Sequence, residues 1–144
     1  MRACGMLLPV SSLPSPYGIG AFSESAYRFV DTLKEAGQKY WQILPLGPTS
    51  YGDSPYQSFS SFAGNPYFID LELLCKEKLL KKAECEAVAW GSDPRRVDYG
   101  TMYHSRYTVL RKASERFLKS VPEDFAGFCE REAEWLDDYA LFMA

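Results

Sequence analysis

Apolar residues in the first half of the chain predict two strands with a helix between them. Residues 3–10 form a short apolar run whose length and flanking turn residues favour a buried strand. Four apolar residues then recur with the spacing of one helix face: Ala26, Phe29, Val30 and Leu33. Ser23 suits the start of that helix and Gly37 its end. Residues 40–46 are a second apolar run, so this region predicts a βαβ unit with parallel strands.

Residues 47–66 follow the second predicted strand and lack the periodicity of a helix or a strand. Loops of this length are uncommon in compact domains, and they usually serve a function or are disordered. Four aromatic rings argue against disorder here: Tyr51, Tyr56, Phe59 and Phe62. Because parallel α/β folds bind ligands at the carboxyl ends of their strands, the loop is a candidate ligand site.

The remaining pattern predicts helices. A short helix is expected near Leu71, a longer one over residues 103–121, and a third that opens at residues 122–124. Proline followed by two acidic residues at 122–124 suits the first turn of a helix. The apolar face of the third helix is formed by Phe125, Phe128, Trp135, Tyr139 and Phe142.

Composition divides the chain at the same place. Residues 1–70 hold nine charged and twelve aromatic residues, together with seven of the nine prolines. Residues 71–144 hold twenty-six charged residues, which is typical of helices with solvated faces. We therefore expect a loop-rich, aromatic part over 1–70 and a helical part over 71–144.

Charge and length exclude several classes of protein. A net charge of −3 without a clustered basic surface gives no case for binding nucleic acid or an anionic membrane. No apolar stretch approaches the length of a transmembrane helix. Pro9 interrupts the N-terminal apolar run and no small-residue cleavage site follows, so a signal sequence is not predicted.

The cysteines form no C-x-x-C pair, and the chain has a single histidine, His104. Free thiols in a reducing cytoplasm are the favoured interpretation for Cys4, Cys75, Cys85 and Cys129. A disulfide or a metal site remains the alternative. His104 lies in a helical run without a partner set, so a surface or core role is favoured over catalysis. The glycines form neither a dinucleotide nor a Walker pattern.

The loop combines rings with small polar groups, as a sugar site requires. An aromatic ring can stack on the apolar face of a pyranose, and hydroxyl and amide groups can bond its hydroxyls. The polar candidates are Ser54, Gln57, Ser58, Ser60 and Ser61. Composition alone favours the other interpretation, a rigid turn whose rings pack inward. Asp53 could be a catalytic acid, but Asp-Ser-Pro is also a favourable turn, and the turn role is preferred.

Three segments of the sequence resemble one known family. They are LPVSSLPSPYGIG, YWQILPLGPTSYGDSPYQSFSSFAGNPYFIDL and RRVDYG, and the run from Glu134 to Phe142 also fits. Together they are similar to the N-terminal region of the 4-α-glucanotransferases, or amylomaltases. The resemblance covers nearly the whole chain and is weakest over residues 75–95.

The resemblance implies an α/β fold that is the N-terminal portion of a (β/α)8 barrel of the TIM type. Residues 1–70 would then be the start of the catalytic barrel, with the substrate loop at 47–66. Residues 71–144 would be a mostly helical inserted subdomain before the third barrel strand.

The resemblance also implies transfer of α-1,4-glucan segments between maltooligosaccharides by a retaining mechanism with two carboxylates. In the family those carboxylates follow later strands, so no catalytic residue is assigned here and the chain alone is expected to be inactive. No cofactor and no metal are expected. By resemblance, Tyr56 and Ser54 contact sugar near the scissile bond, and Tyr51 and Tyr103 form a second glucan site.

Other functions remain open from the sequence. An α-glucan hydrolase of the same clan would differ only in passing the sugar to water. A non-catalytic module would bind glucan through the loop tyrosines alone. A helical interaction protein would use residues 71–144, and its helices would expose an apolar stripe.

Overall fold

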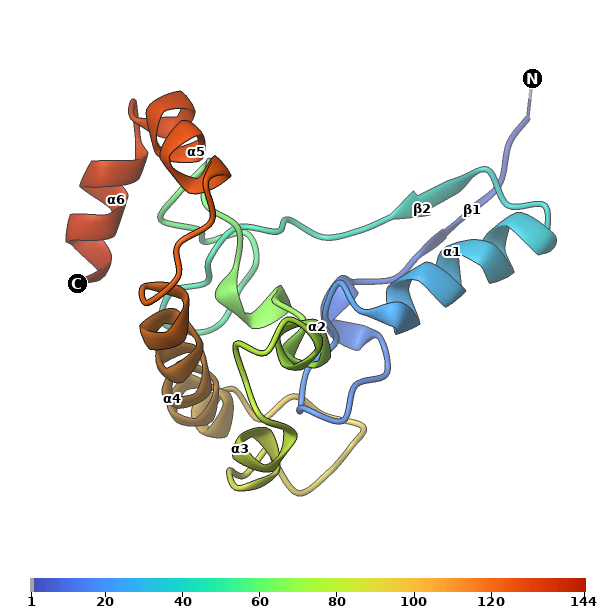
Figure 1. The fold of residues 1–144 in the computed structure, drawn as a ribbon. Coiled ribbons are helices and arrows are strands. Elements are labelled where there is room, and N and C mark those ends of the chain that lie inside the picture. Colours follow the sequence, from blue (N-terminus) through green and yellow to red (C-terminus); the bar gives the residue numbers. More distant parts are fainter. Residues whose placement is uncertain (1) are drawn as a thin grey trace.

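A computed structural model describes residues 2–144 and begins with the expected strand, helix and strand (Figure 1). Strand β1 (Gly5–Leu7) pairs in parallel with β2 (Tyr40–Gln42), and α1 (Glu24–Glu35) lies along them. The register joins Gly5 to Tyr40, Met6 to Trp41 and Leu7 to Gln42. The predicted βαβ unit with parallel strands is therefore confirmed. It forms an arm that extends away from the other helices.

Helix α1 begins and ends at the residues that the sequence suggested. The Ser23 hydroxyl accepts a hydrogen bond from the Ser25 N–H at 3.3 Å, which caps the first turn. Gly37 follows the last turn with φ of +70°, a conformation that favours glycine. The apolar face of the helix packs Phe29 against Trp41, with ring centroids 5.1 Å apart. This contact holds the helix against the strand pair.

The strands are shorter and more exposed than predicted. All three residues of β1 are exposed, and in β2 only Trp41 is half-buried. The expectation that the first strand is buried is therefore wrong in the described part of the chain, residues 2–144. The sheet has two strands in this part of the chain, and α1 is the helix that lies along it. Pairing stops soon after the bond from Leu8 N–H to Gln42 O, because Pro9 and Pro45 have no N–H to donate.

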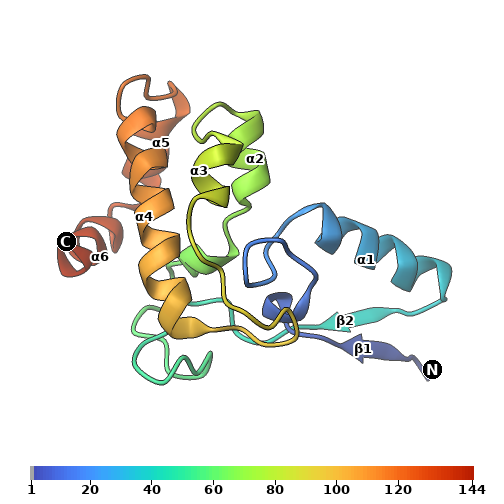
Figure 2. The same cartoon turned by 90° about the horizontal axis from the view of Figure 1, so that it is seen from below.

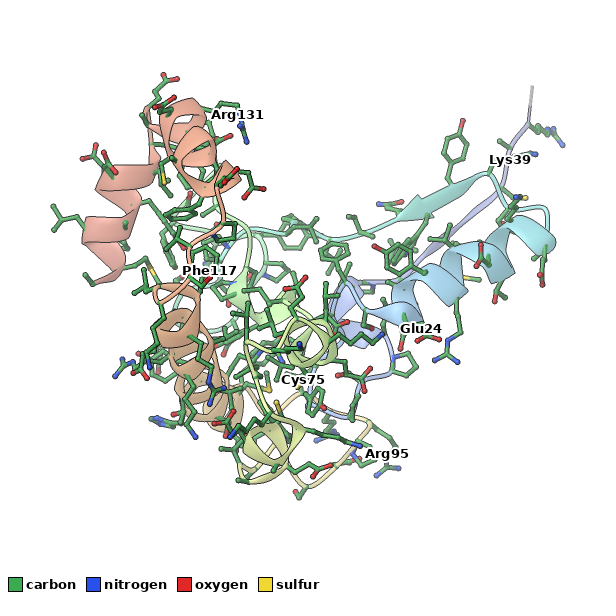
Figure 3. All side chains as sticks on the ribbon, viewed as in Figure 1. Glu24, Lys39, Cys75, Arg95, Phe117 and Arg131 are labelled. Atoms are coloured by element: carbon green, nitrogen blue, oxygen red, sulfur yellow. The ribbon has the colours of Figure 1, made fainter. Side chains whose placement is uncertain are left out.

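The second half is helical, as predicted, with more breaks than expected. Its helices are α2 (Leu71–Lys76), α3 (Lys82–Glu86), α4 (Tyr99–Phe117), α5 (Asp124–Glu132) and α6 (Leu136–Met143). Helices α2, α3 and α4 lie side by side (Figure 2). They share a core with Tyr17 from the first half, and Cys75 of α2 packs into this core (Figure 3). The sequence analysis did not predict α3.

Helix α4 begins at Tyr99, four residues before the predicted start at 103. The Asp98 carboxylate accepts bonds from the Thr101 N–H at 3.0 Å and the Thr101 hydroxyl at 2.8 Å. This cap was present in the sequence as Asp98 followed three residues later by Thr101, and it was missed. The correction matters because the added turn brings Tyr99 into the helix.

An ion pair joins α3 to α4 and predicts acid sensitivity. The Arg116 guanidinium donates two bonds of 2.7 Å to the half-buried Glu84 carboxylate, which lowers the pKa of Glu84 from 4.5 to about 2. A carboxyl whose pKa is depressed by folding stabilises the fold above its unfolded pKa and loses that contribution as pH falls towards the folded pKa. We expect the thermal midpoint of the protein to fall more between pH 5 and pH 2.5 than that of Glu84→Gln. Parallel pH curves for the two proteins would exclude this role.

Candidate functional site

The loop 47–66 has no α-helix or strand, as predicted, and the 3₁₀ turn Pro66–Phe68 begins at its last residue, but its first part is ordered as a narrow hairpin-like turn. An isolated bridge joins Thr49 to Ser58, and the Ser50 hydroxyl donates to Gln57 O at 3.1 Å. At the tip, the N–H of Asp53 donates to Ser50 O at 3.0 Å. Gly52 has φ of +92° and Asp53 φ of +55°. The loop therefore presents residues 51–56 at its end.

The base of the loop is fixed by Asn65. Its N–H donates to Leu46 O at 2.8 Å, which draws the two ends of the loop together. Its buried side-chain oxygen accepts from the Tyr67 N–H at 2.9 Å and caps the 3₁₀ turn Pro66–Phe68. At Gly47 any Cβ would run into the side chain of Ser58, so the base has no room for a larger residue.

The four rings of the loop have two different surroundings. Phe59 stacks on Tyr139 with centroids 6.3 Å apart, and Phe62 stacks on Trp135 at 5.8 Å. Tyr51 is fully exposed, and Tyr56 is 72% exposed. The two phenylalanines thus contact rings of the C-terminal segment, although Phe62 stays 70% exposed, whereas Tyr51 and Tyr56 have no ring partner among residues 2–144. None of the four rings is buried, so the interpretation of a turn whose rings all pack inward is wrong, although the phenylalanines do take part in ring packing.

The C-terminal segment is bent between α5 and α6, and the residue at the bend contacts the loop. The predicted single helix beyond residue 122 is wrong, because the chain leaves helical geometry between Glu132 and Leu136 and forms α5 and α6. Trp135 sits at this bend, where its indole N–H donates to the Glu132 carboxylate at 2.8 Å. Its ring can then stack on Phe62. The sequence pattern shows an apolar face but gives no sign of the break between α5 and α6.

Tyr56 borders an open hollow of about 610 Å³, which residues 45–47 also line a few positions beyond the end of β2. Phe62 lies on another side of the hollow, and three serines complete the rim: Ser58, Ser60 and Ser61. A hollow with exposed ring faces and hydroxyl groups has the surface chemistry that sugar binding requires.

Most of these hydroxyls also hold the loop in shape. The Ser54 oxygen accepts from the Tyr56 N–H at 3.4 Å, so it orients the backbone that carries the Tyr56 ring. Ser58 donates to Ser60 O at 2.7 Å, and the Ser60 oxygen accepts from the Phe62 and Ala63 N–H groups. These hydroxyl groups therefore stabilise the loop itself. Ser58 and Ser60 also line the hollow, and a hydroxyl group can form more than one hydrogen bond.

Tyr103 lies on α4, apart from the loop. It is 60% exposed, and its ring contacts Tyr107 at 5.5 Å. One turn earlier, Tyr99 lines a cavity of about 100 Å³ together with Asp53 and Asn65, so the start of α4 lies beside the loop (Figure 2). Among residues 2–144, no ring contact joins Tyr103 to Tyr51 or Tyr56. The structure thus gives two separate aromatic platforms.

Asp53 lies in a turn, as the sequence favoured, but its backbone N–H makes the turn bond. Its carboxyl group lines the small cavity beside Tyr99, and burial raises its pKa. His104 is exposed on α4. Within residues 2–144, no cluster of histidine, cysteine and acidic side chains is arranged to hold a metal, and all four cysteines are free thiols. No helix in the same range is long and apolar enough to span a bilayer.

A parallel βαβ unit with a long aromatic loop after its second strand is typical of an α/β protein, and that loop is the candidate ligand site. Residues 8–144 match the family described as 4-alpha-glucanotransferase, glycoside hydrolase family 77, and the chain belongs to that family.

Relatives with known names agree with this assignment. A 4-alpha-glucanotransferase from Clostridium butyricum is 58% identical over 135 residues, covering 94% of this chain and 28% of the relative. One from Thermus thermophilus is 52% identical over 147 residues, covering 99% and 28%. An amylomaltase from Streptococcus agalactiae, solved in complex with acarbose, superposes with a TM-score of 0.93 at 46% identity, covering 100% of this chain and 29% of that one. The chain therefore spans less than a third of the relatives it matches.

Proposed function

We propose that this chain forms part of an enzyme that transfers α-1,4-linked glucan segments between maltooligosaccharides. The observation that carries the proposal is the family match over residues 8–144, which includes the whole aromatic loop. The exposed rings of Tyr51 and Tyr56 support it, since open tyrosine faces are suited to stack on sugar. Its substrates would be α-1,4-glucans, and its expected location is the cytoplasm, where free thiols persist.

The finer architecture is part of the same proposal. Residues 1–70 would begin a catalytic (β/α)8 barrel, and residues 71–144 would be a helical insertion. Two observations support this: the strand pair is parallel, and its exposed residues leave room for further elements to cover the sheet. Barrels of this kind place their sites at the carboxyl ends of the strands, where the loop 47–66 begins.

Each candidate residue then has a role in holding sugar. Tyr56 would stack on a glucose unit near the bond that is cut, and Ser54 would orient Tyr56 and contact the sugar. Tyr51 and Tyr103 would bind a more distant stretch of the same glucan. The nucleophile and the acid/base would be carboxylates elsewhere in the longer protein, forming and then resolving a glycosyl-enzyme with retention. No catalytic residue is assigned within this chain.

Product analysis tests the proposal. The full-length enzyme that carries this sequence is incubated with maltotriose, and the products are separated by chain length. We expect glucose together with chains longer than the substrate, because another sugar accepts the glycosyl group. Glucose and maltose with nothing longer would identify water as the acceptor, and the protein would be an α-glucan hydrolase.

A further inference from the structure

Cys75 and Cys85 are neighbouring thiols that lie outside the candidate sugar site. Cys75 is half-buried on α2, and Cys85 on α3 has no exposed surface. Cys85 belongs to the core that α2, α3 and α4 share, and Cys75 packs against the same core. The two side chains are close enough for a hydrogen bond between their thiol groups. Two thiols in contact need only a small movement to form a disulfide.

The turn between α2 and α3 brings this thiol pair together. The Lys78 N–H donates to Cys75 O at 3.1 Å, and the Leu79 N–H donates to Leu74 O at 2.9 Å. Lys78 has φ of +64°, and together with the two bonds this completes a Schellman motif at the end of α2. The chain therefore reverses here and continues into α3, so backbone hydrogen bonds determine that the two helices, and with them the two thiols, lie together.

The surroundings of the two thiols give them different reactivity. Cys75 is half-buried, so a small oxidant in the solvent can reach its sulfur. Cys85 has no contact with solvent, and burial together with the neighbouring Cys75 thiol raises the pKa of Cys85 to about 12. Cys85 is therefore a protonated thiol at neutral pH and is inert towards an oxidant in the solvent. It can react only with a group that Cys75 carries.

We propose that Cys75 and Cys85 are a redox-modification site, at which hydrogen peroxide converts the two thiols to a disulfide. In the first step the Cys75 thiolate attacks one oxygen of the peroxide, the O–O bond breaks, and Cys75 sulfenic acid and hydroxide form. In the second step the Cys85 sulfur attacks the Cys75 sulfur, the S–O bond breaks, and the Cys85 proton leaves with the hydroxyl group as water. The two thiols lose two electrons in total, and the peroxide receives them.

The disulfide joins α2 to α3 and protects Cys75 from further oxidation. A sulfenic acid without a neighbouring thiol is oxidised to sulfinic and sulfonic acids, which thiols cannot reduce. A disulfide is returned to two thiols by exchange with a thiol reductant. The pair is thus two free thiols under reducing conditions, as in the structure, and becomes a disulfide when peroxide is present.

Peptide mapping of the full-length enzyme tests the site. The enzyme is treated with hydrogen peroxide, catalase then removes the oxidant, and the remaining thiols are alkylated in denaturant. Digestion with trypsin, without reductant, places Cys75 in peptide 40–76 and Cys85 in peptide 83–95. We expect mass spectrometry to show these two peptides joined, with the loss of one hydrogen from each thiol, and dithiothreitol to separate them.

The joined peptides should be at least about tenfold more abundant than any linked peptide that holds Cys4 or Cys129, because contact in the native fold favours one pairing. Cys129→Ala is the matched control, since Cys129 is also a half-buried thiol but lies on α5. This variant should form the linkage between peptides 40–76 and 83–95 to the same extent as the unaltered enzyme.

Two further variants separate the roles of the two thiols. In Cys75→Ala, Cys85 should remain a thiol that is alkylated in denaturant, because peroxide does not reach it. In Cys85→Ala, peptide 40–76 should gain oxygen atoms that dithiothreitol does not remove, because the sulfenic acid of Cys75 has no thiol to react with. Cys85→Ala removes a buried sulfur and can lower stability, whereas Cys75→Ala alters a half-buried residue and keeps the test decisive.

Either of two results would overturn the proposal. One is that peptides 40–76 and 83–95 stay unlinked in the unaltered enzyme, whether Cys75 remains a thiol or is oxidised irreversibly. The other is that linkages of Cys75 or Cys85 to other cysteines are as abundant as the linkage between the two, which would show random pairing in unfolded protein.

Discussion

The 144-residue chain produced alone is expected to yield no transfer products from maltotriose, under conditions in which the full-length enzyme makes longer chains. A retaining mechanism needs two carboxylates placed on either side of the scissile bond. The candidate loop offers one carboxyl group, Asp53, and it lines a small cavity beside Tyr99 rather than the hollow beside Tyr56. The loss should therefore be complete, and chromatography of the products against a buffer blank measures it.

Misfolding must be separated from missing chemistry in that experiment. The strand pair leaves its residues exposed and its outer edges unpaired, and such edges promote aggregation. Circular dichroism and size-exclusion chromatography of the isolated chain should show folded helices and a defined size before activity is judged. Robust transfer by a folded, isolated chain would show that it contains the catalytic groups, and the assignment of none would be wrong.

The sequence was sufficient where local chemistry decides the structure. Helix α1 follows from the spacing of its apolar face, the Ser23 cap and the positive φ at Gly37, all of which act within a few residues. The parallel strand pair follows because a helix of this length joins the two apolar runs. The loop 47–66 was predictable because its apolar residues show neither the period of a helix nor that of a strand.

Tertiary contacts decide the features that the sequence analysis missed. The period-3.6 pattern after residue 122 is continuous and gave no signal of the bend at Trp135, whose ring stacks on Phe62 from the loop. The strands look buried in sequence because their residues are apolar, yet their exposure depends on what covers the sheet. Helix α3 has only five residues, too short for a periodic pattern.

The candidate site shows the same division. Composition identified a ring-rich and hydroxyl-rich loop, but it could not separate Tyr56 from Phe62. The two rings are about equally exposed, and the difference lies in a ring partner more than seventy positions away in the chain, since Phe62 stacks on Trp135 and Tyr56 has no ring partner among residues 2–144.

Tyr56→Ala in the full-length enzyme is expected to lower kcat/KM for maltotriose transfer roughly ten- to a hundredfold, because the substitution removes one aromatic stacking surface. The ring is 72% exposed and borders the hollow, so its removal should leave the thermal midpoint nearly unchanged. Tyr56→Phe should keep most of the activity, because the stacking face remains and only the phenol hydroxyl is lost.

Tyr27→Ala provides the matched control, since Tyr27 is 71% exposed on α1 and lies outside the loop. Removing that ring deletes the same number of atoms from an equally open position, so any general effect of losing a surface tyrosine appears in both variants. A specific loss in Tyr56→Ala, with Tyr27→Ala and Tyr56→Phe near the unaltered rate, assigns the effect to a ring at this place. Equal activity of Tyr56→Ala and the unaltered enzyme would remove Tyr56 from the sugar site, and the loop would then be a structural turn that Phe59 and Phe62 anchor on α6 and the preceding bend.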